Sequence, residues 1–171
     1  MLNLSAMKVY QLYATQFLPT GPDTAWEFLS DPRNLQHITP GHMNFSMLTD
    51  TVSAMYPGQV ICYKVTLWPG ISVKWVTEIT HVEYGSYFVD EQRFGPYSFW
   101  HHKHFINKAD GGVIMQDIVD YKLPMGILGQ WMNHLVIKNK LSDIFSYRAE
   151  KLEAYFGEGK ESAVNIKFRS F

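Results

Sequence analysis

The sequence contains only one cysteine, Cys62, among its 171 residues. A single cysteine excludes an internal disulfide and any zinc site built from cysteines. Such a residue is more often a buried strand position than a nucleophile. Sparse use of cysteine also fits a reducing compartment, where disulfides are rare.

Long apolar runs and a leader pattern are missing as well. No apolar stretch reaches the roughly 20 residues that a membrane-spanning helix needs. The opening residues Met-Leu-Asn-Leu-Ser lack the charged region and the apolar run of a signal peptide. We therefore expect no integral membrane segment and a cytoplasmic location.

Charged residues are scarce, at 18%, and the formal net charge is -1 without any basic run. A nucleic-acid partner or a polybasic membrane surface is therefore not expected, because both need a cluster of positive charge. Hydrophobic residues make up 46% and aromatic residues 15% of the chain. This composition fits one domain with a full core, and it leaves an apolar surplus that can line a pocket.

Turn residues divide the first part of the chain into strands and two short helices. A breaker-free run predicts a first strand over about residues 4–18. Capping and proline signals then predict one short helix that carries Trp26 and another that carries Leu35. Six further strands are expected at residues 44–50, 59–67, 71–83, 86–94, 98–108 and 113–122.

From about Met125 the apolar spacing changes to a helical period, with Trp131, Phe145 and Leu152 near one stripe. This predicts one long helix of about seven or eight turns. The element order describes an α+β half-open grip. A curved antiparallel seven-stranded sheet would surround the long C-terminal helix, two short helices would follow the first strand, and a cavity would remain between them.

The hairpin at Asp110-Gly111 predicts which strand residues face one another. If these two residues form the centre of the turn, Ala109 faces Gly112. Counting back pairs Ile106 with Met115, His104 with Asp117, His102 with Val119 and Trp100 with Tyr121. Alternation places these pairs on one face. A carboxylate thus lies opposite an imidazole on a largely apolar surface, where either group alone would be costly to bury.

Several motifs resemble those of the START-like (SRPBCC) superfamily, and most closely a bacterial subfamily of it. They are Ser30–Leu35, Ile38–Pro40, Asp90–Tyr97, Trp100–Phe105 and Tyr121–Gly126. The superfamily includes polyketide cyclases and plant pathogenesis-related lipid binders. The resemblance covers roughly residues 4–156 and implies a helix-grip fold whose cavity takes hydrophobic small molecules. It implies no particular reaction, because fold similarity alone does not give function.

We therefore expect the protein to bind a small hydrophobic molecule, either lipid-like or aromatic and polyketide-like, as a carrier or sensor. Two alternatives remain, a cyclase- or dehydratase-type enzyme and an interaction protein with a filled core. The expected ligand-binding residues are Trp100, His102, His104, Gln92, Met115, Asp117, Tyr121 and Trp131. Gln92 would bond a ligand head or a neighbouring loop, and Trp131 would cover the cavity mouth or join the core.

The catalytic candidates of the enzyme hypothesis are His104, Asp117 and His102. An imidazole oriented by a carboxylate can remove a proton beside a carbonyl. The same three residues also permit a hydrogen-bonded polar pair in the cavity wall, or a two-histidine, one-carboxylate iron site. We favour the polar pair, and we expect no metal and no cofactor.

The last residues alternate again, with Val164, Ile166 and Phe168 on one face of a predicted strand. An open sheet has exposed edges that accept an added strand, from the same chain or from a second copy in a homodimer. We therefore expect residues 1–156 to form a START-like ligand-binding domain. Residues 157–171 would be a C-terminal tail that pairs with a sheet edge.

Overall fold

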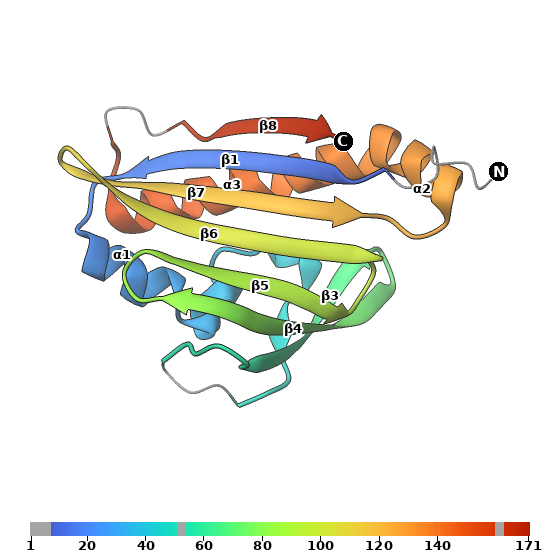
Figure 1. Ribbon diagram of the computed structural model, residues 1–171, viewed down its shortest axis with the longest axis horizontal. Helices are drawn as coiled ribbons and strands as arrows, with labels where there is room; N and C mark the ends of the chain where they lie inside the picture. Colours follow the sequence, from blue (N-terminus) through green and yellow to red (C-terminus); the bar gives the residue numbers. More distant parts are fainter. Residues whose placement is uncertain (1–7, 51–53, 160–162) are drawn as a thin grey trace.

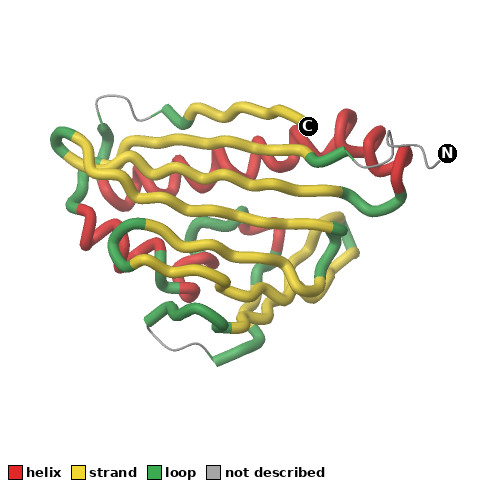
Figure 2. Tube along the Cα trace, in the orientation of Figure 1, coloured by secondary structure: helices red, strands yellow, loops and turns green. Residues whose placement is uncertain are grey.

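The computed structural model describes residues 8–50, 54–159 and 163–171. They form a curved sheet with the helices on one side, as Figures 1 and 2 show. Within the described part of the chain the sheet is antiparallel and has eight strands, in the order β2-β3-β4-β5-β6-β7-β1-β8. The seven that precede the long helix are β1 (Tyr10–Leu18), β2 (Ser46–Met47), β3 (Val60–Trp68), β4 (Ile71–Glu83), β5 (Tyr87–Phe94), β6 (Phe99–Ala109) and β7 (Gly112–Lys122).

All seven strands lie where the sequence predicted them, although β2 is only two residues long. The first was expected from about residue 4, and residues 4–7 lie outside the described residues. The eighth strand, β8 (Asn165–Ser170), comes from the C-terminal segment and pairs antiparallel with β1 (Figure 1). The curved sheet around a long C-terminal helix confirms the predicted fold class, and β8 adds one strand to it.

The β6–β7 hairpin has the predicted register, with Ala109 opposite Gly112 and every pair from Ile106–Met115 to Trp100–Tyr121 as expected. Gly111 adopts a φ of 75°, a conformation that glycine reaches without steric cost. Gly112 lies so close to β1 that a Cβ would collide with the carbonyl oxygen of Leu18. The turn chemistry thus fixes which side chains of the two strands share a face.

The helices differ from the prediction in two details. The first short helix is α1 (Pro22–Leu29), but the second is two 3-10 turns, η2 (Pro32–Gln36) and η3 (Gly41–Met43). The long helix is not uniform, because a π-helical turn, η4 (Asn133–Ile137), joins α2 (Gly126–Met132) to α3 (Lys138–Phe156). The helical period of the sequence does not reveal the extra residue that a π turn inserts.

The core lies between the concave face of the sheet and α3. Leu141, Phe145 and Leu152 project from α3 into it. Among the described residues the buried side chains form three clusters, of which one lies near α1, one beneath β1 and β7, and one near β3 and β4. Among the described residues, no helix has both the length and the apolar character needed to cross a bilayer.

Candidate functional site

A cavity of about 340 Å³ lies between the sheet and the helical layer. Side chains from β3, β4, β5 and β6 form one wall, and residues of α1, η2, α2 and α3 form the other. Most of this lining is apolar, including Ile38, Met43, Tyr63, Val65, Trp75, Ile79, Phe88, Trp100, Leu141, Ile144 and Phe145. The aromatic surplus of the sequence is therefore partly used to line a cavity.

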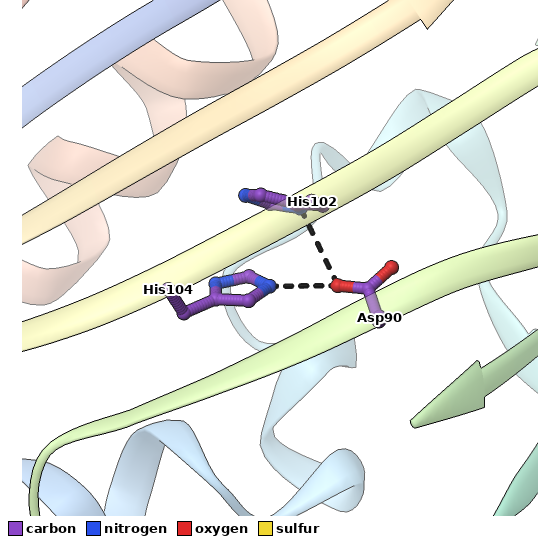
Figure 3. Close-up of side chains that lie close together, drawn as sticks. All are labelled: Asp90, His102 and His104. Atoms are coloured by element: carbon purple, nitrogen blue, oxygen red, sulfur yellow. Dashed lines mark hydrogen bonds and ion pairs between the residues drawn. The ribbon is translucent and has the colours of Figure 1, made fainter. Parts of the chain in front are cut away.

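Three polar side chains, Asp90, His102 and His104, meet at the cavity wall (Figure 3). Asp90 projects from β5, and both histidines project from β6. His104 Nε2 donates a hydrogen bond to Asp90 Oδ2 at 2.7 Å, and His102 Nδ1 lies 3.5 Å from the same oxygen. One carboxylate oxygen thus faces a nitrogen of each imidazole.

A second carboxylate, Asp117 on β7, lies on the other side of the two imidazoles and is fully buried. His102 Nε2 donates to Asp117 Oδ1 at 3.0 Å. His104 Nδ1 lies 2.8 Å from the same oxygen, as an ion-pair contact without hydrogen-bond alignment. The Arg148 Nη1 atom of α3 approaches Asp117 Oδ1 to 3.4 Å. Each imidazole therefore lies between two carboxylates.

Local sequence explains most of this arrangement. The two-residue period of a strand puts His102 and His104 on the same face. The register places Asp117 opposite His104 on β7, and Asp90 opposite His102 on β5. Arg148 follows Phe145 by three residues, so it lies on the buried face of α3. These periods determine the face on which each of the five charged or titratable residues lies, and the packing of the four elements brings them together.

The two carboxylates are held in the charged form. Burial opposes the ionisation of Asp117, but Arg148 and the two histidines outweigh it and hold the pKa of this carboxyl well below its usual range. Burial likewise opposes the ionisation of Asp90, and the hydrogen bond from His104 with the nearby positive charges lowers its pKa. Because both acids are anionic, the two histidine nitrogens that hydrogen-bond to them, His102 Nε2 and His104 Nε2, are donors.

The pKa values of the two histidines are shifted in opposite directions. Burial disfavours the charged form of His104, but its contacts with Asp117 and Asp90 are stronger and raise its pKa. Burial and the neighbouring charge of His104 lower the pKa of His102 despite its bond to Asp117. The raised pKa of His104 favours its positive form, and an imidazolium beside Arg148 would balance the two carboxylates. Such compensation of charge makes the burial of the cluster tolerable.

Three of the predicted ligand-binding residues, Trp100, His102 and His104, line the cavity. The other five are not among the lining residues, and the binding role of all eight stays a prediction. Asp117 lies behind the histidines, and Met115 is buried in the core. Tyr121 is fully buried and donates to Asn133 Oδ1 at 2.8 Å.

Gln92 and Trp131 are the remaining two. Gln92 Nε2 donates to the Tyr97 carbonyl at 2.6 Å, and the Tyr97 N–H donates back to Gln92 Oε1 at 3.2 Å. This is the loop-bonding alternative that the sequence left open. The side chain of Trp131 on α2 is 67% exposed, so it does not belong to the core.

Sequence reasoning did not assign two members of the cluster. Asp90 was considered for the cavity face, but not as a partner of both histidines. Arg148 was missed, although a charged residue on the apolar stripe of a helix needs a buried partner. That mismatch was the available signal, and it does not identify which acid the arginine meets.

No family model matches this chain, and no curated protein matches it. Solved structures do share its fold. A START superfamily protein from Mycobacterium smegmatis is 11% identical, with a TM-score of 0.65, over 86% of this chain and 97% of that chain. StfQ, a di-domain ARO/CYC from the steffimycin biosynthetic pathway, is 12% identical, with a TM-score of 0.62, over 86% of this chain and 51% of that chain.

Ara h 8.0201 is also similar, at 16% identity and a TM-score of 0.57, over 86% of this chain and 97% of that chain. Likeness at such low identity shows the fold and not the activity. The chain therefore has a START-like fold, as the sequence motifs predicted.

Proposed function

We propose that the protein binds a small hydrophobic molecule, lipid-like or aromatic and polyketide-like, as a carrier or sensor. The observation that carries the proposal is the cavity of about 340 Å³ with its apolar lining. Small-molecule sites are roughly 300–1,000 Å³ in volume and are mostly apolar with a few polar groups. The presence of a cavity also disfavours the filled-core interaction protein that the sequence left open.

The polar cluster suggests the shape of the ligand. Asp90, His102 and His104 lie at the cavity wall, whereas most of the lining from β3 and α3 is apolar, with Lys140 and Arg148 as its charged members. A molecule with an apolar body and one oxygen-containing group would fit this division. The START-like and ARO/CYC neighbours support a hydrophobic cargo of this kind. We propose that residues 1–156 form the binding domain and that residues 157–171 add an edge strand to it.

The test compares two isoleucine-to-tryptophan variants. Ile144 lines the cavity, whereas Ile114 lies on β7 outside the lining and is 40% exposed. Ile144→Trp should fill the cavity and abolish saturable binding of an apolar fluorophore, while Ile114→Trp should bind as the unaltered protein does. Mass spectrometry of organic extracts of the purified protein would identify a retained molecule.

Binding measurements with fatty acids, sterols and aromatic ketides can refute the carrier proposal. If none of them displaces the fluorophore or binds on its own, the carrier proposal fails. Equal binding by the two tryptophan variants would place the fluorophore outside the cavity and would also count against it.

A second candidate is a cyclase- or dehydratase-type reaction that uses the histidines. The observation in its favour is that His102 lines the cavity while Asp117 holds its Nε2, so a carboxylate orients an imidazole toward a bound molecule. His102→Gln should then abolish turnover of a bound ketide while leaving its affinity within about tenfold. Unchanged turnover would exclude His102 as the acid or base.

A further inference from the structure

We propose that Asp90, His102 and His104 bind a divalent transition-metal ion at the wall of the cavity. The sequence offered a metal site only as an alternative, with Asp117 as the carboxylate ligand, and the favoured expectation was no metal. It does not depend on the proposed hydrophobic ligand, because the ion and its ligands are argued from the three side chains and their surroundings.

The candidate ligand atoms of the three residues already lie close together. One ligand atom from each of the three residues lies within 4.8 Å of the other two. Asp90 Oδ2 lies 2.7 Å from His104 Nε2 and 3.5 Å from His102 Nδ1. Metal–ligand bonds of about 2.0–2.2 Å hold neighbouring donor atoms roughly 3 Å apart, so only small side-chain movements separate this cluster from a ligand set.

The position of the other nitrogen of each imidazole ring also supports metal binding. His102 Nε2 lies 3.0 Å and His104 Nδ1 lies 2.8 Å from one oxygen of Asp117. Histidines that bind metals usually donate their other N–H to a carboxylate, which fixes the tautomer and the ring orientation. Here Asp117 Oδ1 accepts from His102 Nε2, and His104 Nδ1 lies next to the same oxygen. In the metal-bound state His102 Nδ1 and His104 Nε2, the two nitrogens that face Asp90, would supply the lone pairs, and His104 Nε2 would give up the proton that it donates to Asp90.

Asp117 is itself contacted by Arg148, whose Nη1 lies 3.4 Å from Asp117 Oδ1, and both residues are buried. The two histidines and the aspartates are on strands β5, β6 and β7, which are paired at the positions of these four residues. A site on paired strands keeps its geometry better than one on loops. The groups behind the proposed ligands, Asp117 and Arg148, are therefore buried, and the ligands themselves are on rigid strands.

The cavity supplies the open positions of the ion. Asp90, His102 and His104 all line it, whereas Asp117 is not among the lining residues. Three protein ligands with the remaining positions open to a pocket are typical of catalytic sites, whereas structural sites are closed by four. An oxygen of a cavity-bound molecule would complete the coordination.

The donor set selects the kind of ion. Two imidazoles and one carboxylate suit zinc, iron and neighbouring first-row metals, whereas calcium and magnesium prefer oxygen ligands alone. With both imidazoles neutral, Asp90, Asp117 and Arg148 leave one negative charge in a buried region. A divalent cation reverses this charge to one positive, which an anionic oxygen ligand such as a carboxylate or enolate would neutralise.

A matched control lies on the same strand. His101 points to the other face of β6, where its Nε2 is 3.8 Å from Glu91, and it is not a cavity residue. His101→Gln removes an imidazole one position away from His102 and leaves the cluster intact. It therefore separates binding at the cavity from binding at surface histidines.

The experiment uses tag-free full-length protein treated with EDTA and then titrated with Zn²⁺ by calorimetry and with Co²⁺ by visible absorption. We expect one ion per chain. Asp90→Asn and His104→Gln should each weaken Zn²⁺ binding at least about 100-fold, and Asp117→Asn about 10–100-fold. His101→Gln should stay within about twofold of the unaltered protein. Far-UV circular dichroism would confirm that each variant is folded.

Absence of saturable Zn²⁺ and Co²⁺ binding by the unaltered protein would overturn the proposal. Retention of full affinity by both folded Asp90→Asn and His104→Gln would also overturn it, as would equal loss in His101→Gln. Because only the metal alone is added, these outcomes are independent of whether a hydrophobic molecule binds.

Discussion

At the scale of single residues, Asp117 is the group on which the polar cluster depends. Its side chain is fully buried and lies within 3.4 Å of His102, His104 and Arg148. Removing one partner of a buried charge network leaves the others without compensation, and this costs more than the pair itself contributes. Asp117→Ala should therefore lower the free energy of unfolding by about 3–5 kcal/mol.

Denaturant unfolding of Asp117→Ala is best compared with that of Asp120→Ala on the same strand. Asp120 lies on the opposite face, where it accepts from Gln11 and from Lys103. Partly exposed ion pairs contribute about 0–1 kcal/mol, so the second variant should lose little more than this. Equal losses in the two variants would contradict a special role for Asp117.

The protonation of His104 predicts a pH dependence of stability in the metal-free protein. The pKa of His104 is raised in the folded state by its contacts with Asp117 and Asp90, which outweigh burial. A raised folded pKa contributes stability that is fully present below the ordinary histidine value of about 6.5. That contribution is lost as the pH rises through the folded pKa. The stability gap between the unaltered protein and His104→Gln should therefore narrow from pH 6 towards pH 9.

Chemical denaturation at several pH values, in the presence of EDTA, measures this gap. In an Asp90→Asn background the same comparison should show a weaker pH dependence, because one of the two anionic partners of His104 is gone. A gap that is constant or that widens with rising pH would show that His104 is neutral in the folded protein.

At the scale of elements, α2 has the features of a cavity entrance. Met125, Gly129 and Met132 contribute to the cavity lining, whereas Ile127 and Trp131 of the same segment are 61% and 67% exposed. Exposed apolar groups beside a pocket suggest that this helix moves or contacts a partner during ligand exchange. The π turn η4 directly after α2 supplies a local irregularity at which such movement can begin.

Gly129→Ala tests the packing of this helix. A Cβ at Gly129 would collide with the carbonyl oxygen of Pro124 and touch Leu123, so α2 must shift away from the preceding loop. We expect a loss of about 1–3 kcal/mol in stability from the overpacking and faster dissociation of an apolar fluorophore.

Gly41→Ala is the control for this substitution, because nothing lies within 4 Å of a Cβ at Gly41. It should change stability by no more than about 0.5 kcal/mol and leave the dissociation rate unaltered. Stopped-flow displacement measures the rate. If Gly129→Ala also leaves the rate unaltered, α2 is not the entrance.

At the scale of the whole molecule, β8 is the terminal strand of the sheet next to β1. Ile166 lies opposite Ala14 and Phe168 opposite Leu12, and both side chains pack against the core cluster beneath β1. Truncation after Gly157 removes this strand and exposes that apolar surface. It should lower the free energy of unfolding by about 2–4 kcal/mol, since each buried apolar side chain contributes about 1.5–3 kcal/mol and these are only partly buried.

Thermal unfolding of the truncated chain measures this loss, and two point variants localise it. Phe168→Ser removes an inward side chain, whereas Lys167→Ser changes its exposed neighbour. Only the first should lower the melting temperature. An unchanged melting temperature after truncation would refute a stabilising role for β8. The predicted homodimer is tested separately by light scattering of the full-length and truncated proteins.

The sequence alone determined the elements and the register of the central hairpin. Hydrophobic alternation and turn residues are local signals, so they placed β3 to β7 within a residue or two. The Asp110-Gly111 turn fixed His104 opposite Asp117, because turn chemistry sets the register of the strands that it joins. The fold class followed from the order of these elements and from motifs spread along the chain.

Only the tertiary structure decided the composition of the polar cluster and the existence of the cavity. Asp90 meets the histidines through the β5–β6 register, and the loop from Gly95 to Ser98 does not specify that register by its residues alone. Arg148 reaches Asp117 because α3 docks at one particular position on the sheet. Both contacts join distant segments whose relative placement depends on the curvature of the whole sheet. Periodicity shows which face a residue occupies, whereas packing decides which residues meet there and how much space remains between them.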